Sequence, residues 1–110
     1  MRRTLAVLLL VAAAPSSGFV SKRAATVEIT IEGIAFAEVK DPLRVGDTIV
    51  WVNKDVVAHT ATAKNGDWRV VIPPNAKAKM VLKKAGAVDY YCEYHPNMTG
   101  RLVILTDPPK

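Results

Sequence analysis

Alternating apolar and polar residues dominate the chain from residue 26 onward and predict β-strands. In the segment 26–32, Val27, Ile29 and Ile31 fall on one face and polar residues on the other. The segment 47–53 is apolar and β-branched on both faces, as expected for a central strand. Asn65-Gly66, a strong hairpin signal, separates two further segments of this kind. The expected strands are 26–32, 47–53, 59–64, 68–72, 76–83, 87–92 and 101–106.

These segments, with the turns between them, indicate seven or eight strands at the spacing typical of all-β folds. No segment shows a convincing helical period, and there is no internal repeat or linker. We therefore expect one all-β domain, a Greek-key β-sandwich spanning residues 26–106, with a short C-terminal tail at 107–110.

The first 25 residues differ from the rest. Two arginines precede an unbroken apolar run from Leu5 to Ala14, and small and turn-forming residues follow it. This order is typical of a secretory signal peptide, and the run is about half the length that a bilayer span needs. We expect a signal peptide in residues 1–25, cleaved between 14 and 25 and best after Ala14, so that the mature protein is periplasmic or secreted. An uncleaved membrane anchor is the alternative.

The charge balance does not point to nucleic acid. The formal net charge is +5, and removing Arg2 and Arg3 leaves 13 basic against 10 acidic residues, or +3. Because this excess is spread along the chain without a basic run, a solvated basic face is the better interpretation.

The chain contains a single cysteine, Cys92, which cannot form an internal disulfide. It must be a buried inert thiol, a partner in an intermolecular bond, or a thiolate with a chemical task. In an oxidising compartment a free thiol is vulnerable unless it is shielded or coordinated, so its neighbours decide the matter.

Those neighbours carry metal-binding side chains. Cys92, His95 and Met98 follow one another at intervals of three, where a strand is expected to end and a loop to begin. The only other histidine, His59, stands at the start of an expected strand. A sandwich can place the ends of two non-adjacent strands side by side. We therefore predict that these four residues form one metal site.

The donor set selects the metal. Two imidazoles and a thiolate with a weak axial thioether are the ligands of a blue-copper site. Structural zinc sites prefer four Cys or His ligands, and a thioether adds little for zinc. We predict one copper ion of type 1, Cu(I) or Cu(II). Taken singly, each of these residues is more often a packing or surface residue, and only their combination favours a ligand role.

Two blocks of the sequence resemble the cupredoxins of the plastocyanin, pseudoazurin and amicyanin group. The blocks are 45–55, which leads to His59-Thr60, and 89–100, and the resemblance runs from about Val27 to Leu105. The two residues between His95 and Met98 match the short amicyanin loop. The resemblance implies His59, Cys92 and His95 as strong ligands, Met98 as the axial ligand, and partner docking near His95, with Ala58, Tyr94 and Pro96 close by.

The chain departs from that family at the residues around the ligands. Many relatives have Asn after the first histidine, where it ties the two ligand loops together, and this chain has Thr60. Glu93 stands where a small hydroxyl residue often follows the cysteine, and Tyr94 replaces a frequent proline. These departures alter the hydrogen bonding around the ligands, which tunes a bound copper. By strand parity Tyr90 should be buried and Tyr91 should face outward as a second electron route.

These features favour a monomeric electron carrier that shuttles single electrons between redox partner proteins. All four expected ligand positions are occupied by side chains, which leaves no open position for substrate, so we do not expect an enzyme. The alternative is a copper-handling protein that sequesters or delivers periplasmic copper. A metal-free sandwich that acts in adhesion is the third hypothesis. The sequence does not identify the partners.

Overall fold

The structure is a computed structural model that describes residues 24–106; the expected signal peptide, up to residue 23, and the expected tail at 107–110 lie outside the described residues. The described part contains eight strands and no helix, as the sequence predicts. It therefore contains no helix long and apolar enough to cross a bilayer. The strands are β1 (Thr26–Ile31), β2 (Leu43–Arg44), β3 (Thr48–Asn53), β4 (His59–Ala63), β5 (Arg69–Ile72), β6 (Lys77–Val81), β7 (Gly86–Cys92) and β8 (His95–Leu105).

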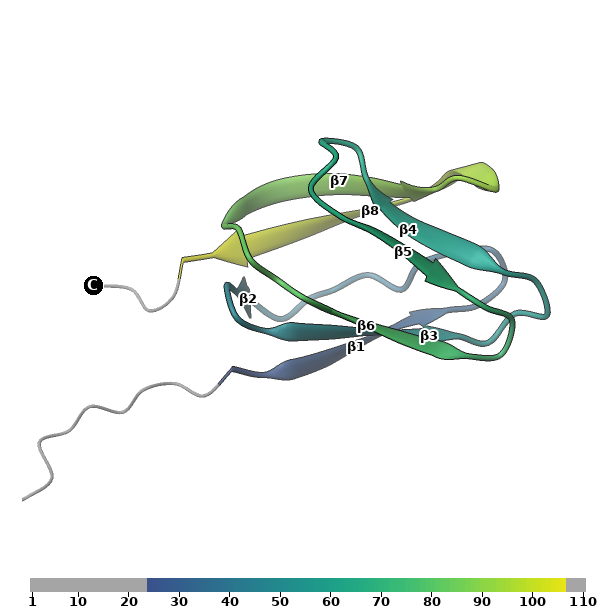
Figure 1. The fold of residues 1–110 in the computed structure, drawn as a ribbon, viewed down its shortest axis with the longest axis horizontal. Coiled ribbons are helices and arrows are strands. Elements are labelled where there is room, and N and C mark those ends of the chain that lie inside the picture. Colours follow the sequence, from purple (N-terminus) through teal and green to yellow (C-terminus); the bar gives the residue numbers. More distant parts are fainter. Residues whose placement is uncertain (1–23, 107–110) are drawn as a thin grey trace, which may run out of the picture.

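The strands form two layers (Figure 1). One sheet has the order β1-β3-β6 and the other the order β2-β8-β7-β4-β5. Strands β1 and β3 are parallel, whereas β4 and β5 form the antiparallel hairpin predicted from Asn65-Gly66. The chain crosses from one sheet to the other at every connection from β1 to β4, and again between β5 and β6 and between β6 and β7. The predicted all-β sandwich is confirmed.

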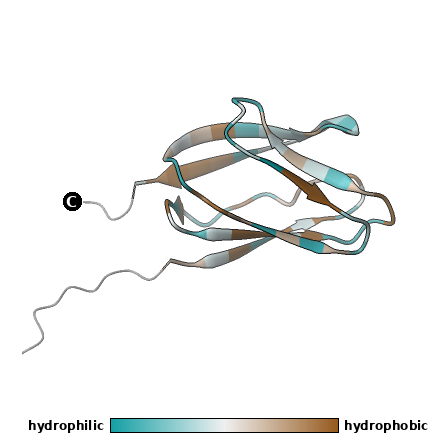
Figure 2. Ribbon diagram, in the orientation of Figure 1, coloured by the Kyte–Doolittle hydropathy of each residue, from teal (hydrophilic) through white to brown (hydrophobic). Residues whose placement is uncertain are grey.

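Alternation along the strands buries one face of each sheet. Ile29, Ile49 and Trp51 point into the core, as the pattern predicts, and Trp51 contacts the rings of Phe36 and Tyr90. Figure 2 shows apolar segments interrupted by polar ones along strands of both sheets. Area removed from water in this way is the main stabilising contribution to such a sandwich.

Two sequence predictions about strands were wrong. The last strand begins at His95 instead of residue 101, because the segment after Cys92 folds back through a two-residue turn and pairs with β7. Pro96, which has no amide to donate, and the lack of alternation concealed this strand. The short strand β2 was also missed; it is two residues long and directly follows Pro42, so its residues resemble a turn.

Buried Asn53 organises the loop that leads from β3 to β4. Its side-chain amide donates to the carbonyl groups of Val57 at 2.9 Å and Pro73 at 3.0 Å, while its side-chain oxygen accepts from the amide of Asp55 at 2.9 Å. Because a buried amide that loses such partners costs free energy, these bonds define the path of the loop. The loop ends at His59, the first residue of β4.

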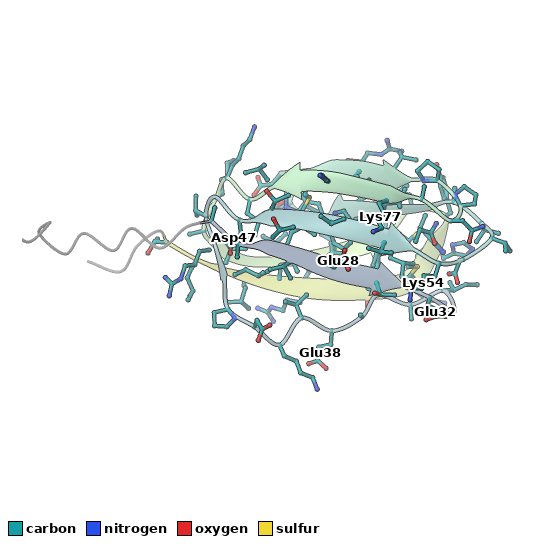
Figure 3. All side chains as sticks on the ribbon, turned by 90° about the horizontal axis from the view of Figure 1, so that it is seen from below. Glu28, Glu32, Glu38, Asp47, Lys54 and Lys77 are labelled. Carbon is teal, nitrogen blue, oxygen red and sulfur yellow. The ribbon has the colours of Figure 1, made fainter. Side chains whose placement is uncertain are left out.

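The outer face of the three-stranded sheet is solvated and carries charges of both signs (Figure 3). Lys77 of β6 lies 3.8 Å from Glu28 of β1, and both side chains are exposed. Exposed pairs of this kind contribute little to stability.

Gly100 of β8 provides a test of the packing. It lies opposite Tyr90, and a Cβ atom at position 100 would lie 2.8 Å from Cε1 of that ring and nearer still to its far end. Tyr90 is enclosed by Trp51 and Trp68 and cannot move freely. We expect Gly100→Ala to lower the free energy of unfolding of the metal-free protein by about 1–3 kcal/mol, measured by urea unfolding. Thr99→Ala, at the exposed neighbouring position, should cost clearly less; equal losses would contradict the account.

Candidate metal centre

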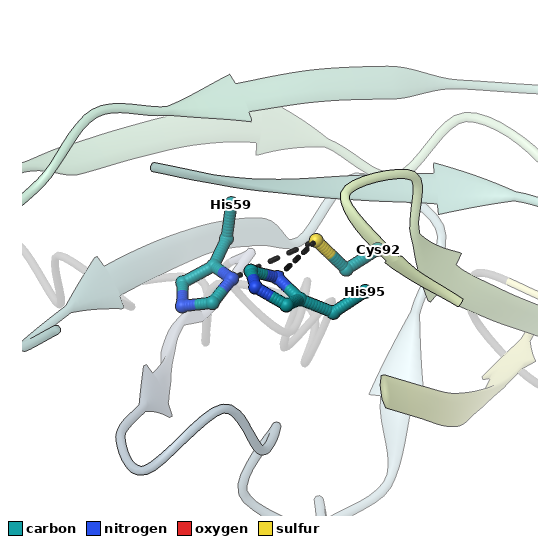
Figure 4. Close-up of side chains that lie close together, drawn as sticks. All are labelled: His59, Cys92 and His95. Atoms are coloured by element: carbon teal, nitrogen blue, oxygen red, sulfur yellow. Dashed lines mark hydrogen bonds between the residues drawn. The ribbon is translucent and has the colours of Figure 1, made fainter. Parts of the chain in front are cut away.

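The side chains of His59, Cys92 and His95 converge at one end of the sandwich (Figure 4). The Cys92 sulfur lies 3.6 Å from Nδ1 of His59 and 3.8 Å from Nδ1 of His95. The donor atoms of the three residues all lie within 4.8 Å of one another. His59 and Cys92 are fully buried, whereas His95 is half-buried. The structure thus brings together three of the four residues predicted to bind the metal.

The strands place these residues. Cys92 ends β7 and His95 begins β8, so the turn of Glu93 and Tyr94 sets them side by side in one hairpin. The pairing shifts register between Tyr91 and Cys92, which sets the cysteine apart from the regular ladder. His59 comes from β4, the other neighbour of β7 in the same sheet.

Met98 lies in β8, three residues beyond His95, and is buried. It lines a hollow of about 430 Å³ whose other walls include His95, Pro96 and Ile34. Met98 and His95 thus lie in the same strand and line the same hollow. Its role as the axial ligand stays a prediction.

Asp55 orients the His59 ring. Its carboxylate lies 2.8 Å from Nε2 of His59 and also accepts the amides of Gly33 at 2.8 Å and Ile34 at 2.9 Å. The Ile34 amide and the His59 ring hold the pKa of Asp55 below its ordinary value. An ionised carboxylate only accepts hydrogen bonds, so Nε2 of His59 carries a proton, and Nδ1, which faces Cys92, is the ring nitrogen left for a metal.

Sequence reasoning missed Asp55. A carboxylate four residues before an expected histidine ligand was a usable signal, but in a loop that spacing does not fix where the side chain lies. The contact depends on the loop path that Asn53 imposes.

Thr60 and Glu93, the departures noted in the sequence, connect the two ligand segments. The Thr60 amide lies 3.4 Å from the Cys92 sulfur, and the Thr60 hydroxyl accepts the amide of Glu93 at 2.8 Å. A hydroxyl therefore joins the segments where Asn does so in many relatives. Partial desolvation raises the pKa of Glu93, but hydrogen bonds from Arg69 and Thr62 outweigh it and bring the pKa below its ordinary value.

The two tyrosines before the cysteine follow strand parity. Tyr90 is buried in the core, and its burial raises its pKa above the ordinary value. Tyr91 is half-buried and lies beside Thr62 of β4. The structure thus confirms the expected side of each ring, while the electron route through Tyr91 stays a prediction.

The donor set fits copper on its own chemistry. A thiolate favours soft Cu(I), and imidazole nitrogen suits both Cu(I) and Cu(II). Both imidazoles turn a ring nitrogen, Nδ1, toward the sulfur, so that one ion could contact all three donor atoms.

Comparison with known proteins agrees with this geometry. The family model of the cupredoxin-like domain matches residues 3–104. The chain belongs to the cupredoxin-like family. Amicyanin from Paracoccus versutus is 28% identical over 87 residues, covering 71% of this chain and 64% of that protein. Amicyanin from Paracoccus denitrificans is 29% identical over 68 residues, covering 56% of this chain and 52% of that protein. The chain thus spans between half and two thirds of these relatives.

Solved amicyanin structures share the fold. An oxidised mutant superposes with a TM-score of 0.62 at 21% identity, covering 71% of this cupredoxin and 80% of that chain. The reduced Cu(I) form of another mutant at pH 4 superposes with a TM-score of 0.61 at 22% identity, covering 72% and 81%. At this identity the match supports the cupredoxin fold and nothing finer.

The contact between Asp55 and His59 leads to a prediction. Asp55→Asn keeps the shape of the side chain but removes its charge, and its amide can no longer enforce the protonated Nε2. We expect copper affinity to fall by about tenfold or more, measured by competition with a chelator. Asp89→Asn, which removes an exposed carboxylate that pairs with Arg101 and with neither histidine, is the control. Equal affinities for the two variants would exclude the positioning role of Asp55.

Proposed function

We propose that this cupredoxin is a diffusible electron carrier that holds one type 1 copper through His59, Cys92, His95 and Met98. The observation that carries the proposal is the convergence of the Cys92 sulfur and the two Nδ1 atoms at the buried end of the sandwich. Copper bound there would supply a one-electron Cu(I)/Cu(II) couple. The family membership and the amicyanin relatives support the same function.

The described residues are suited to hold the site in one geometry through both oxidation states. His59 is fixed by Asp55, and Cys92 accepts the amide of Thr60. Both ligands are fully buried. Donors that are held in place by the scaffold need little rearrangement when the charge of the site changes, and this favours fast electron exchange.

His95 is the ligand suited to meet a partner. It is half-buried, and exposed apolar side chains lie next to it in the sequence or across the hollow that it lines: Tyr94 is 52% exposed and Ile34 49%. Val57 and Ala58, in the loop before His59, add apolar surface that is exposed or half-exposed. We infer that redox partner proteins dock on this surface and that the electron leaves through the His95 edge.

The arrangement favours a carrier over an enzyme. With four side chains on the copper, no position remains for a substrate. We further propose that residues 1–25 are a signal peptide, that residues 26–106 form a domain that acts as a monomer in the periplasm, and that residues 107–110 are a C-terminal tail. Rapid transfer of copper to an acceptor, without redox cycling, would instead indicate copper handling.

The first test is the optical spectrum. Adding Cu(II) to the metal-free protein should give an intense blue colour from thiolate-to-copper charge transfer, and Cys92→Ser should abolish it while leaving the circular dichroism of the sandwich unchanged. A colourless wild-type complex would rule out the type 1 site.

The second test concerns Met98. A weak thioether contact stabilises Cu(II), so we expect Met98→Leu to retain copper and raise the reduction potential, measured by voltammetry. Met80→Leu, a methionine of β6 in the other sheet, is the matched control and should leave the potential unchanged. A lower potential in Met98→Leu would contradict the axial role.

A further inference from the structure

A closed ring of hydrogen bonds lies against β4 beside Cys92. The Glu93 amide donates to the Thr60 hydroxyl at 2.8 Å, and the Thr60 and Thr62 hydroxyls are 3.0 Å apart. The Thr62 hydroxyl donates to the Glu93 carboxylate at 3.1 Å, which returns the ring to the residue where it began. Glu93 is thus held to the same two threonines by its backbone and by its side chain.

The direction of every bond in the ring is fixed. An ionised carboxylate only accepts hydrogen bonds, so the Thr62 hydroxyl must donate its single proton to Glu93. The proton between the two hydroxyls therefore comes from Thr60, whose oxygen is left to accept the Glu93 amide. Donors that run in one direction around a ring strengthen one another.

Arg69 anchors the carboxylate from the neighbouring strand. It stands opposite Thr62 in the pairing of β4 with β5, and its Nε donates to Glu93 at 2.6 Å. An exposed ion pair alone contributes little to stability. Here, however, the carboxylate oxygen that pairs with Arg69 also accepts the Thr62 hydroxyl. The ion pair therefore keeps the Glu93 carboxylate in the position that closes the ring.

The ring replaces backbone pairing where β4 and β7 part. Register between these strands extends only over Thr62 with Tyr91 and Ala63 with Tyr90. Beyond that point the Thr60 amide meets the Cys92 sulfur and the Glu93 amide meets the Thr60 hydroxyl. Thr60 is fully buried, so breaking the ring would leave a buried donor or acceptor without its partner.

We propose that Glu93, Thr62 and Arg69 are positioning residues that clamp the turn after Cys92 to β4 and so fix the sulfur relative to His59 before metal binds. With a carboxylate and two hydroxyls, the clamp ties the two ligand segments together in a chain that has Thr60 where the resemblance implies Asn in many relatives. Its effect on copper rests on the proposed function, whereas its effect on the turn does not.

The test uses Thr62→Val, a substitution that opens the ring without changing charge or shape. Amide hydrogen exchange of Glu93 in the metal-free protein should become about five- to tenfold faster, as expected for the loss of about one hydrogen bond. Copper loss to a chelator should accelerate by a similar factor. Thr62→Ser, which keeps the hydroxyl, should stay close to wild type in both measurements.

A second pair of variants tests the anchor. Arg69→Gln should change both rates in the same direction as Thr62→Val, whereas Arg101→Gln, which breaks the exposed pair with Asp89 and removes the same charge, should change neither. Rates within twofold of wild type in Thr62→Val, or equal effects in Thr62→Val and Thr62→Ser, would overturn the clamp. A wild-type protein that forms no blue complex would refute the proposed function. Exchange of the Glu93 amide in the metal-free protein would still test the clamp, because it does not depend on copper.

Discussion

The amide of Thr60 meets the sulfur of Cys92 across 3.4 Å, and this contact joins the two strands that carry the buried ligands. A thiol sulfur is a weak acceptor, so one bond of this kind could not hold a ligand in place alone. It lies among stronger bonds: Asp55 to His59 on one side, and Glu93 to Thr60 on the other. The geometry of the site follows from these contacts, because each ligand that is buried is tied to the backbone or to a carboxylate.

The fold allows such a site to form from few segments of the chain. Neighbouring strands β4, β7 and β8 bring their ends together at one end of the sandwich, so three short segments supply all the proposed donors. The core below them is rigid, with Trp51, Tyr90 and Phe36 in mutual contact. Loop residues that would otherwise be mobile are bound by buried Asn53. Within residues 24–106, eight strands and a single cysteine are therefore enough to form a well-defined metal geometry.

Local sequence patterns predicted most of the strands and the metal site. They failed where contacts between distant segments determine the structure. Strand patterns and turn signals located seven of the strands, and the spacing of Cys92, His95 and Met98 predicted a metal site. The patterns misplaced the start of β8, because pairing with β7 creates that strand from residues that do not alternate. The contacts of Asp55 with Gly33 and Ile34, and those of the Glu93 side chain with Thr62 and Arg69, could not be predicted for a related reason. They join residues more than 20 positions apart in the sequence, which only the folded strands bring together. Thr60 departs from the residue that many relatives have after the first histidine, yet its hydroxyl still connects the two ligand segments.

The central claim is that His59, Cys92 and His95 hold one copper ion at their meeting point. Anomalous diffraction at the copper absorption edge, from crystals of the copper-loaded protein, tests this most directly. The account predicts a single strong peak bonded to the Cys92 sulfur and to Nδ1 of both histidines, with the Met98 sulfur as a longer fourth contact. A peak elsewhere on the molecule, or one bonded to neither Cys92 nor His59, would contradict it.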